Sequence, residues 1–317
     1  MAVYTQVSSE ALAELLAHYD VGELVSAKGI AEGVENSNYL VETTRDRFIL
    51  TLYEKRVSAE DLPFFLALLD HLAARGLPVP PAIKDCEGAA IQQVAGRPAC
   101  LIQFLPGVSL SHPTPTQARA AGAALGQMHH AVSDFAQTRP NSMGADTWRP
   151  LLTRCGRDLD GIAPGLFDRV SDALTAIEDT WPTQLPVSEI HADLFPDNVL
   201  MLGEKVTGLI DFYFACTDIR AYDLAVMHSA WTFDVHGGAP DVAVGEALIA
   251  GYTSTHPLTA EERAALPVLA RGACIRFLLS RAWDWLHTPP DALVTRKDPF
   301  AYLRRLEWYE ANPGAFA

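Results

Sequence analysis

The sequence of 317 residues has little of what marks several large classes of protein. Its five cysteines are odd in number and never spaced as C-x-x-C, which argues against a disulfide framework or a zinc site and favours reduced thiols. Basic residues are scarce, because 24 lysines and arginines face 39 aspartates and glutamates, a net charge of −15. Phosphate backbones and anionic lipids attract clustered lysine and arginine, so we expect neither nucleic acid nor a membrane as a partner.

Long apolar runs and repeats are also missing. No stretch reaches the length of a membrane span, and the first residues carry neither the basic region nor the apolar region of a signal peptide. Apolar residues still make up 49% of the chain, enough for one large or two moderate domains. We expect a cytoplasmic protein that acts on small molecules; its oligomeric state is left open.

One polar segment carries the chemistry. It reads His-Ala-Asp-Leu-Phe-Pro-Asp-Asn over residues 191–198 and is followed, after a short apolar run, by Asp211. Phosphoryl transfer needs a carboxylate that accepts the proton of the attacking hydroxyl, and an amide oxygen and a second carboxylate that hold Mg²⁺. We assign Asp193 to the first role, as the catalytic base, and Asn198 and Asp211 to the second, as metal ligands.

The flanks of this segment fit that assignment. Val187–Ile190 reads as a strand that enters the loop, and Val199–Leu202 and residues 206–210 read as two strands joined by a turn at Gly203. Such a hairpin returns Asp211 to the loop. A lone His-x-Asp arises easily by chance, but all three positions at this spacing favour a catalytic site.

Two lobes are predicted along the chain. Residues 1–104 read as helix, hairpin, helix, hairpin, a small lobe on an antiparallel sheet, with strands at 39–43, 48–53, 91–95 and 99–104. Residues 105–317 are mainly helical around the catalytic hairpin. The first lobe is expected to bind nucleotide and the second to hold the catalytic and substrate-binding residues.

Candidate nucleotide contacts lie in the first lobe and at its end. The segment 28–38 contains Gly29, Gly33 and Asn36 and is either an ordinary turn or a loop whose glycines let the backbone approach phosphates. Backbone groups around Gln103 and Leu105 would suit an adenine edge, although the same stretch also reads as a plain link between lobes.

The residues of the catalytic segment resemble the aminoglycoside phosphotransferase and choline kinase superfamily, which carries His-Gly-Asp-(x)₄-Asn and a later Asp. Ala192 replaces the commoner Gly. Within that superfamily the chain is more closely similar to the type II homoserine kinases of bacterial threonine biosynthesis. This likeness is carried by five segments: residues 35–39, 48–54, 62–65, 208–218 and 276–281.

The resemblance implies an α+β, two-lobed, protein-kinase-like fold with a small antiparallel-sheet N-terminal lobe and a larger, mainly helical C-terminal lobe. It implies ATP and Mg²⁺ as cofactors and L-homoserine as the substrate that becomes O-phospho-L-homoserine. It also implies supporting roles for His191, which would order the loop, and for Asp223, which would hydrogen-bond the loop backbone.

The chain departs from the kinase pattern on its third expected strand. A Lys there usually grips the α- and β-phosphates, whereas Thr51 stands at that position here. Homoserine kinases tolerate Thr, so the phosphate anchor is left open. Lys28 and Lys55 are candidates, with a solvated surface role the stronger interpretation for both.

A homoserine site would need an arginine for the carboxylate and a carboxylate for the ammonium group. Arg276 and Arg281 are candidates for the first role, and Asp193, Asp197 and Asp234 for the second. Ordinary ion pairs explain each of these residues about as well.

Other interpretations remain open at this stage. The alternative substrates are choline, which favours an aromatic cage, an aminoglycoside or another amino alcohol. A kinase-like binding module without turnover is motivated by the missing Lys, and a metal-dependent hydrolase built on His191 and Asp193 lacks a third ligand. His129 and Trp231 are interpreted as packed core residues.

Overall fold

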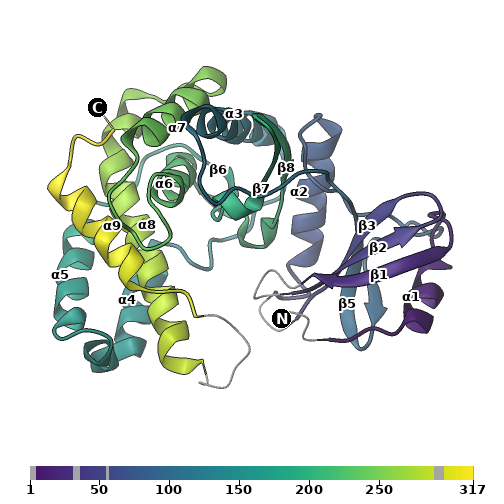
Figure 1. The fold of residues 1–317 in the computed structure, drawn as a ribbon. Coiled ribbons are helices and arrows are strands. Elements are labelled where there is room, and N and C mark those ends of the chain that lie inside the picture. Colours follow the sequence, from purple (N-terminus) through teal and green to yellow (C-terminus); the bar gives the residue numbers. More distant parts are fainter. Residues whose placement is uncertain (1–4, 31–35, 55–56, 289–295, 317) are drawn as a thin grey trace. The chain divides into compact units, whose positions relative to one another are not determined.

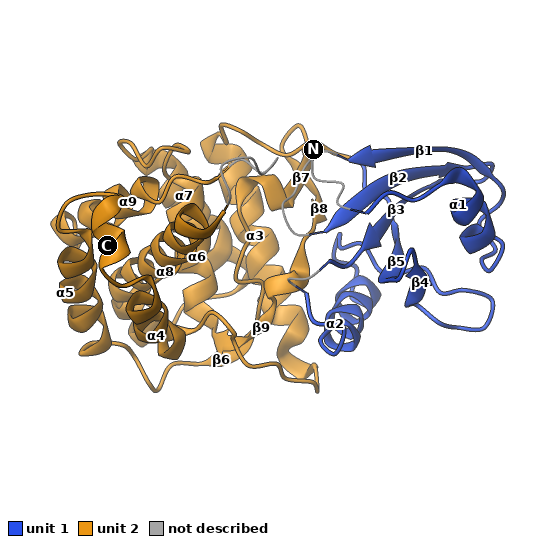
Figure 2. Ribbon diagram, turned by 90° about the horizontal axis from the view of Figure 1, so that it is seen from below, with its two compact units in different colours: residues 1–106, 291–294 blue, residues 107–290, 295–317 orange. Residues whose placement is uncertain are grey.

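The computed structural model describes residues 5–30, 36–54, 57–288 and 296–316 (Figure 1). The chain forms two compact units, coloured separately in Figure 2: residues 1–106 with 291–294 make unit 1, and residues 107–290 with 295–317 make unit 2. The predicted lobe boundary after residue 104 lies close to this division. Gly33 and Lys55 fall outside the described residues.

Unit 1 is built on a five-stranded antiparallel sheet with the strand order β1-β2-β3-β5-β4. Its elements are α1 (Ser9–Leu16), β1 (Leu24–Ile30), β2 (Ser37–Thr43), β3 (Arg47–Leu52), α2 (Leu62–Ala74), β4 (Gln92–Val94) and β5 (Arg97–Gln103). Ser8 starts α1 as expected, because its hydroxyl accepts the Ala11 N–H. Alternate apolar residues of the strands, such as Val41 and Leu50, pack with α1 in one core.

Strand β1 was not predicted. The expectation of a glycine-containing loop from residue 28 is wrong for its first residues, because β1 runs through Gly29, which pairs with Tyr39. Residues of β1 are exposed or half-buried and show no alternation, since the strand lies at the edge of the sheet. An edge strand of this kind leaves no hydrophobic period in the sequence.

Unit 2 is mainly helical and carries two small antiparallel pairs, β6–β9 and β7–β8. Its helices are α3 (Pro115–Ala131), α4 (Ala145–Cys155), α5 (Leu166–Glu178), α6 (Arg220–Trp231), α7 (Val242–Thr255), α8 (Ala260–His287) and α9 (Phe300–Ala311), and its strands are β6 (Val187–Ile190), β7 (Val199–Leu202), β8 (Lys205–Leu209) and β9 (Cys216–Ile219). Helix α8 packs against α4, α6 and α9, and α3 packs against α7 (Figure 1). The antiparallel sheet of unit 1 and the helices of unit 2 confirm the α+β class.

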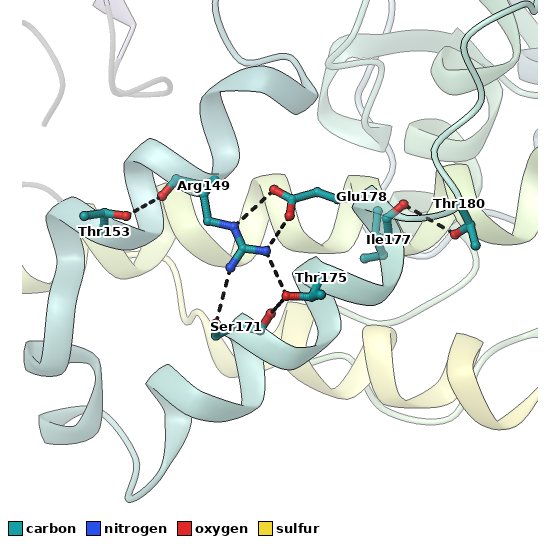
Figure 3. A network of polar contacts seen from close by, with 7 residues as sticks. All are labelled: Arg149, Thr153, Ser171, Thr175, Ile177, Glu178 and Thr180. Carbon is teal, nitrogen blue, oxygen red and sulfur yellow. Dashed lines mark hydrogen bonds and ion pairs between the residues drawn. The ribbon is translucent and has the colours of Figure 1, made fainter.

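Helix α4, like β9, was not predicted, because Pro150 lies inside it and only three of its residues are buried. Hydrogen bonds of a surface arginine, Arg149, link α4 to α5. The Arg149 guanidinium donates to Ser171, Thr175 and Glu178 of α5 (Figure 3), and the hydrogen bond with Glu178 raises the pKa of Arg149. Within the described ranges, no helix combines the length and the apolarity that crossing a membrane requires.

Candidate active site

The catalytic loop, residues 191–198, lies between two strand pairs of unit 2. Strand β6 enters it, the 3₁₀ turn η3 (Pro196–Asn198) ends it, and β7 leaves it to pair with β8. The Ile210 N–H donates to the Asn198 carbonyl at 3.0 Å, so the hairpin returns the chain beside the loop. Asp211 follows directly, and the structure therefore brings it to Asn198.

Asn198 joins the metal-ligand candidates to Asp193. It is 9% exposed, and its Nδ2 donates to the Asp193 carbonyl at 2.8 Å and, at 3.4 Å, to the Asp193 carboxylate. Because the amide nitrogen faces Asp193, the amide oxygen points to the other side. Within the described chain no donor binds that oxygen, so it remains available to a hard cation such as Mg²⁺.

Backbone strain is concentrated at this site. Only Ala95, Ala192 and Asp211 have positive φ among the described non-glycine residues, and Ala192 (63°) and Asp211 (66°) flank the proposed chemistry. The left-handed conformation costs a residue with a Cβ roughly 1–2 kcal/mol, which explains why Gly is commoner at the position of Ala192. Such strain persists only where neighbouring groups hold the backbone firmly.

Asp223, in the first turn of α6, is the group that holds it. Its carboxylate is fully buried and accepts the N–H groups of His191 at 2.7 Å and Ala192 at 2.8 Å. Burial alone would raise the pKa of Asp223, but the hydrogen bond from His129 and the nearby imidazoles lower it overall. An ionised carboxylate thus hydrogen-bonds the backbone just before Asp193.

His129 was interpreted as a packed core residue, and in the structure both nitrogens of its buried ring also contact polar groups. Its Nε2 lies 3.0 Å from Asp223 Oδ2 and its Nδ1 lies 2.9 Å from the Tyr252 hydroxyl. A carboxylate can only accept, so Nε2 carries the proton. Helices α3 and α7 approach closely enough for the Tyr252 contact because Gly122 and Gly251 lack a Cβ, which would meet the opposite backbone at 2.1 and 2.0 Å.

His191 orders the loop as expected. Its ring is buried, Nε2 lies 2.9 Å from the Ile210 carbonyl, and Nδ1 accepts the Asp193 N–H at 3.3 Å. This pattern places the proton on Nε2. Burial lowers the pKa of His191, so the ring is neutral and links the loop to the β8 end that carries Asp211.

Arg276 does not match its predicted role as a substrate-binding arginine. It is 2% exposed, donates to the Ala192 carbonyl, and lies over the rings of Phe214 and Phe277 at 5.5 and 4.5 Å. Arg276 therefore bonds the carbonyl of the strained residue, whereas Asp223 bonds its N–H. The indole N–H of Trp231, which we interpreted as plain core, likewise donates to the Leu194 carbonyl at 3.0 Å.

Several predicted nucleotide contacts in unit 1 are engaged within the unit. Asn36 is 4% exposed and its Oδ1 accepts the Glu54 N–H at 3.3 Å, while the Gln103 N–H donates to the Pro81 carbonyl. Thr51, 1% exposed, donates to Asn38 Oδ1 at 2.8 Å. The backbone N–H of Leu105 has no partner in the described residues, so Leu105 is a better candidate than Gln103 for a contact with the adenine edge.

The remaining substrate candidates lie in unit 2. Asp197 is exposed in the η3 turn. Asp234 accepts the N–H groups of Gly238 and His236, and these hydrogen bonds lower its pKa, the one from Gly238 most strongly. Asp234 thus stabilises its own loop. Arg281 is half-buried on α8, and the Asp193 carboxylate is among the groups that raise its pKa against the larger, lowering effect of burial.

Comparison with known proteins finds relatives among phosphotransferases. A model of the phosphotransferase enzyme family matches residues 26–264. The homoserine kinase of Xanthobacter autotrophicus is 51% identical over 315 residues, with 99% of this chain and 98% of the relative covered. That of Zymomonas mobilis is 53% identical over 312 residues, with 98% and 97% covered.

Solved structures share the fold at low identity. A spectinomycin phosphotransferase superposes with a TM-score of 0.72 at 17% identity, covering 98% of this chain and 99% of the other. A choline kinase from Cryptosporidium parvum gives 0.69 at 15%, covering 96% and 95%. The kinase-like fold is thereby confirmed, and by sequence the chain belongs to the homoserine kinases of the phosphotransferase enzyme family.

Proposed function

We propose that the protein transfers the γ-phosphoryl group of ATP to the hydroxyl of L-homoserine, giving O-phospho-L-homoserine for threonine biosynthesis. Family membership supports the use of ATP and of an alcohol acceptor. The observation that carries the chemistry is the loop itself: Asp193 lies between a backbone fixed by Asp223 and Arg276 and the amide of Asn198.

Asp193 is the proposed catalytic base. It orients the substrate hydroxyl and accepts its proton as the oxygen attacks phosphorus, and the rate depends on how closely that geometry is held. Asn198 and Asp211 would hold Mg²⁺, which when bound neutralises charge on the nucleotide phosphates. Their oxygen donors suit that ion, because Mg²⁺ prefers carboxylate and carbonyl oxygens over nitrogen or sulfur.

On unit 1, Gly29 and the free N–H of Leu105 are the nucleotide contacts we retain, together with Gly33 outside the described residues. Strand β3 contains no lysine that could anchor the phosphates, and Thr51, at the expected position, bonds Asn38. Asp197 is retained only as an exposed residue of the loop. We place the reaction in the cytoplasm.

The test is ADP release with Mg-ATP over L-homoserine, L-serine, choline and kanamycin, followed by ³¹P NMR of the product. L-Homoserine should be turned over fastest and give a phosphate monoester. Faster turnover of choline or kanamycin would change the substrate but keep the kinase, whereas ADP release with none of them would favour a binding module.

A further inference from the structure

Helix α8 brings a second arginine toward the catalytic loop. The helix is anchored where the Arg276 guanidinium donates to the Ala192 carbonyl and where the Phe277 ring lies 4.9 Å from that of Phe195. Arg281 follows Phe277 by four residues. Side chains spaced by four share one face of a helix, so Arg281 lies on the same face as Phe277, one turn or about 6 Å further along the helix.

The Arg281 guanidinium lacks an anionic partner. It lies 4.6 Å from the Tyr302 ring centroid, and its Nη1 donates to the Asp298 carbonyl at 3.2 Å. In the described chain no carboxylate comes within ion-pair distance of it. Burial lowers the pKa of Arg281, as does Arg305, whereas Tyr302 and the more distant carboxylates of Asp193 and Asp298 act in the opposite direction. A half-buried cation without a counter-charge is costly unless a ligand supplies one.

The donors left on Arg281 suit a carboxylate. Nε and Nη2 form one edge of the guanidinium, which matches the two oxygens of a carboxylate, while Nη1 is fixed by Asp298. Tyr302 stacking holds the plane of the group. Arg276, five residues earlier on the same helix, is buried against the loop and does not compete for that role.

We propose that Arg281 binds the α-carboxylate of the substrate and thereby selects a hydroxy-amino acid over an amino alcohol. The proposal rests on the proposed homoserine kinase activity. Homoserine separates its hydroxyl oxygen from its carboxyl carbon by three carbon atoms, so the hydroxyl lies at Asp193 while the carboxylate lies against the exposed edge of Arg281. L-Serine is one methylene shorter and cannot make both contacts.

The test compares two substrates in two proteins. L-Homoserine and 3-amino-1-propanol differ only by the carboxylate, and Arg281→Met keeps the aliphatic stem over Tyr302 while removing the charge. We expect kcat/KM for homoserine to fall about 100-fold or more, and that for 3-amino-1-propanol to change less than about threefold. Arg271→Met, on the same helix with its Nε on the Pro267 carbonyl at 3.4 Å, is the matched control and should alter neither.

Arg281→Lys is the second variant, in case the methionine substitution impairs folding as judged by thermal melting. It keeps the charge without the fork and should lose about tenfold on homoserine alone. Equal losses on both substrates, or no loss on homoserine, would overturn the proposal while the kinase assignment stands. A wild-type protein that turns over neither substrate would instead refute the proposed function.

Discussion

The loop of residues 191–198 in unit 2 and the candidate nucleotide contacts of unit 1 differ in how their polar groups are bonded. The backbone of residues 191–194 is hydrogen-bonded by three buried side chains: Asp223, Arg276 and Trp231. In unit 1 the polar side chains bond one another, as Thr51 does with Asn38, and β3 carries no lysine.

This difference follows from what each region must do. A misplacement of about 1 Å at the base costs roughly 100-fold in rate, so the loop needs a fixed backbone. Backbone N–H groups and a metal ion can stabilise the charge of phosphates, so binding depends less on the exact position of any one side chain. Most of the transition-state stabilisation contributed by side chains should therefore lie in unit 2.

The largest effect should come from Asp193. Asp193→Asn removes the proton acceptor and should lower kcat by about 10³–10⁴-fold, because general base catalysis acts only in the transition state. ATP affinity, measured by isothermal titration calorimetry, should stay within about threefold of wild type. Near-normal turnover by the folded variant would remove Asp193 from the mechanism.

Asp211 should affect binding as well as rate. Asp211→Ala takes one carboxylate from the proposed metal site and should weaken Mg-ATP binding about 100-fold, because a hard cation loses a charged oxygen ligand. Titrating activity with Mg²⁺ measures this directly. An unchanged Mg²⁺ requirement together with unchanged nucleotide affinity would show that Asp211 is not a ligand.

His129 acts on the loop through Asp223 and is a positioning residue. His129→Leu leaves the buried carboxylate with one donor fewer and the Tyr252 hydroxyl unpaired, so we expect a loss of about 2–3 kcal/mol in stability and a tenfold lower kcat. KM for both substrates should be unchanged, and His129→Gln should recover part of kcat. The neighbouring His130→Leu, at an exposed position, is the control; a loss that appears only in KM would contradict the positioning role.

The buried His228 should make the stability of unit 2 depend on pH. Burial on α6 lowers its pKa from 6.5 to about 3. The unfolded chain therefore takes up a proton near pH 6.5 that the folded chain refuses, so this contribution to stability is complete above pH 6.5 and declines as pH falls toward 3. Between pH 7 and 5 it should cost about 2 kcal/mol.

Urea unfolding at several pH values measures that slope. His228→Gln, which can still bond the Tyr309 hydroxyl, should flatten it, whereas His112→Gln at an exposed position should not. An unchanged slope in His228→Gln would mean that other groups dominate the acid response of unit 2.

Much of the site was accessible from sequence, and the gaps have physical causes. The strand–loop–hairpin pattern around residues 187–211 placed Asp193, Asn198 and Asp211 in one region, because turn residues and short apolar runs are local signals. The roles of Arg276 and Arg281 could not be separated in that way. They lie five residues apart on one helix, and only the packing of α8 on the loop decides which one is buried.

The smallest effect concerns Thr51, at the position of the missing lysine. If its hydroxyl replaced that lysine as a phosphate anchor, Thr51→Val would raise KM for ATP at least about tenfold. The hydroxyl already donates to Asn38 Oδ1 at 2.8 Å in a side chain that is 1% exposed, so we expect KM to stay within about twofold. Stability should fall by about 1 kcal/mol, the usual net value of one hydrogen bond. Thr43→Val is the control: its hydroxyl donates to the Val21 carbonyl and accepts the N–H groups of Arg45 and Asp46, so this variant should lose more stability than Thr51→Val, without any effect on ATP. A rise in the KM for ATP confined to Thr51→Val would show that a side chain of unit 1 anchors the phosphates. Side chains of both units would then contribute directly to the reaction.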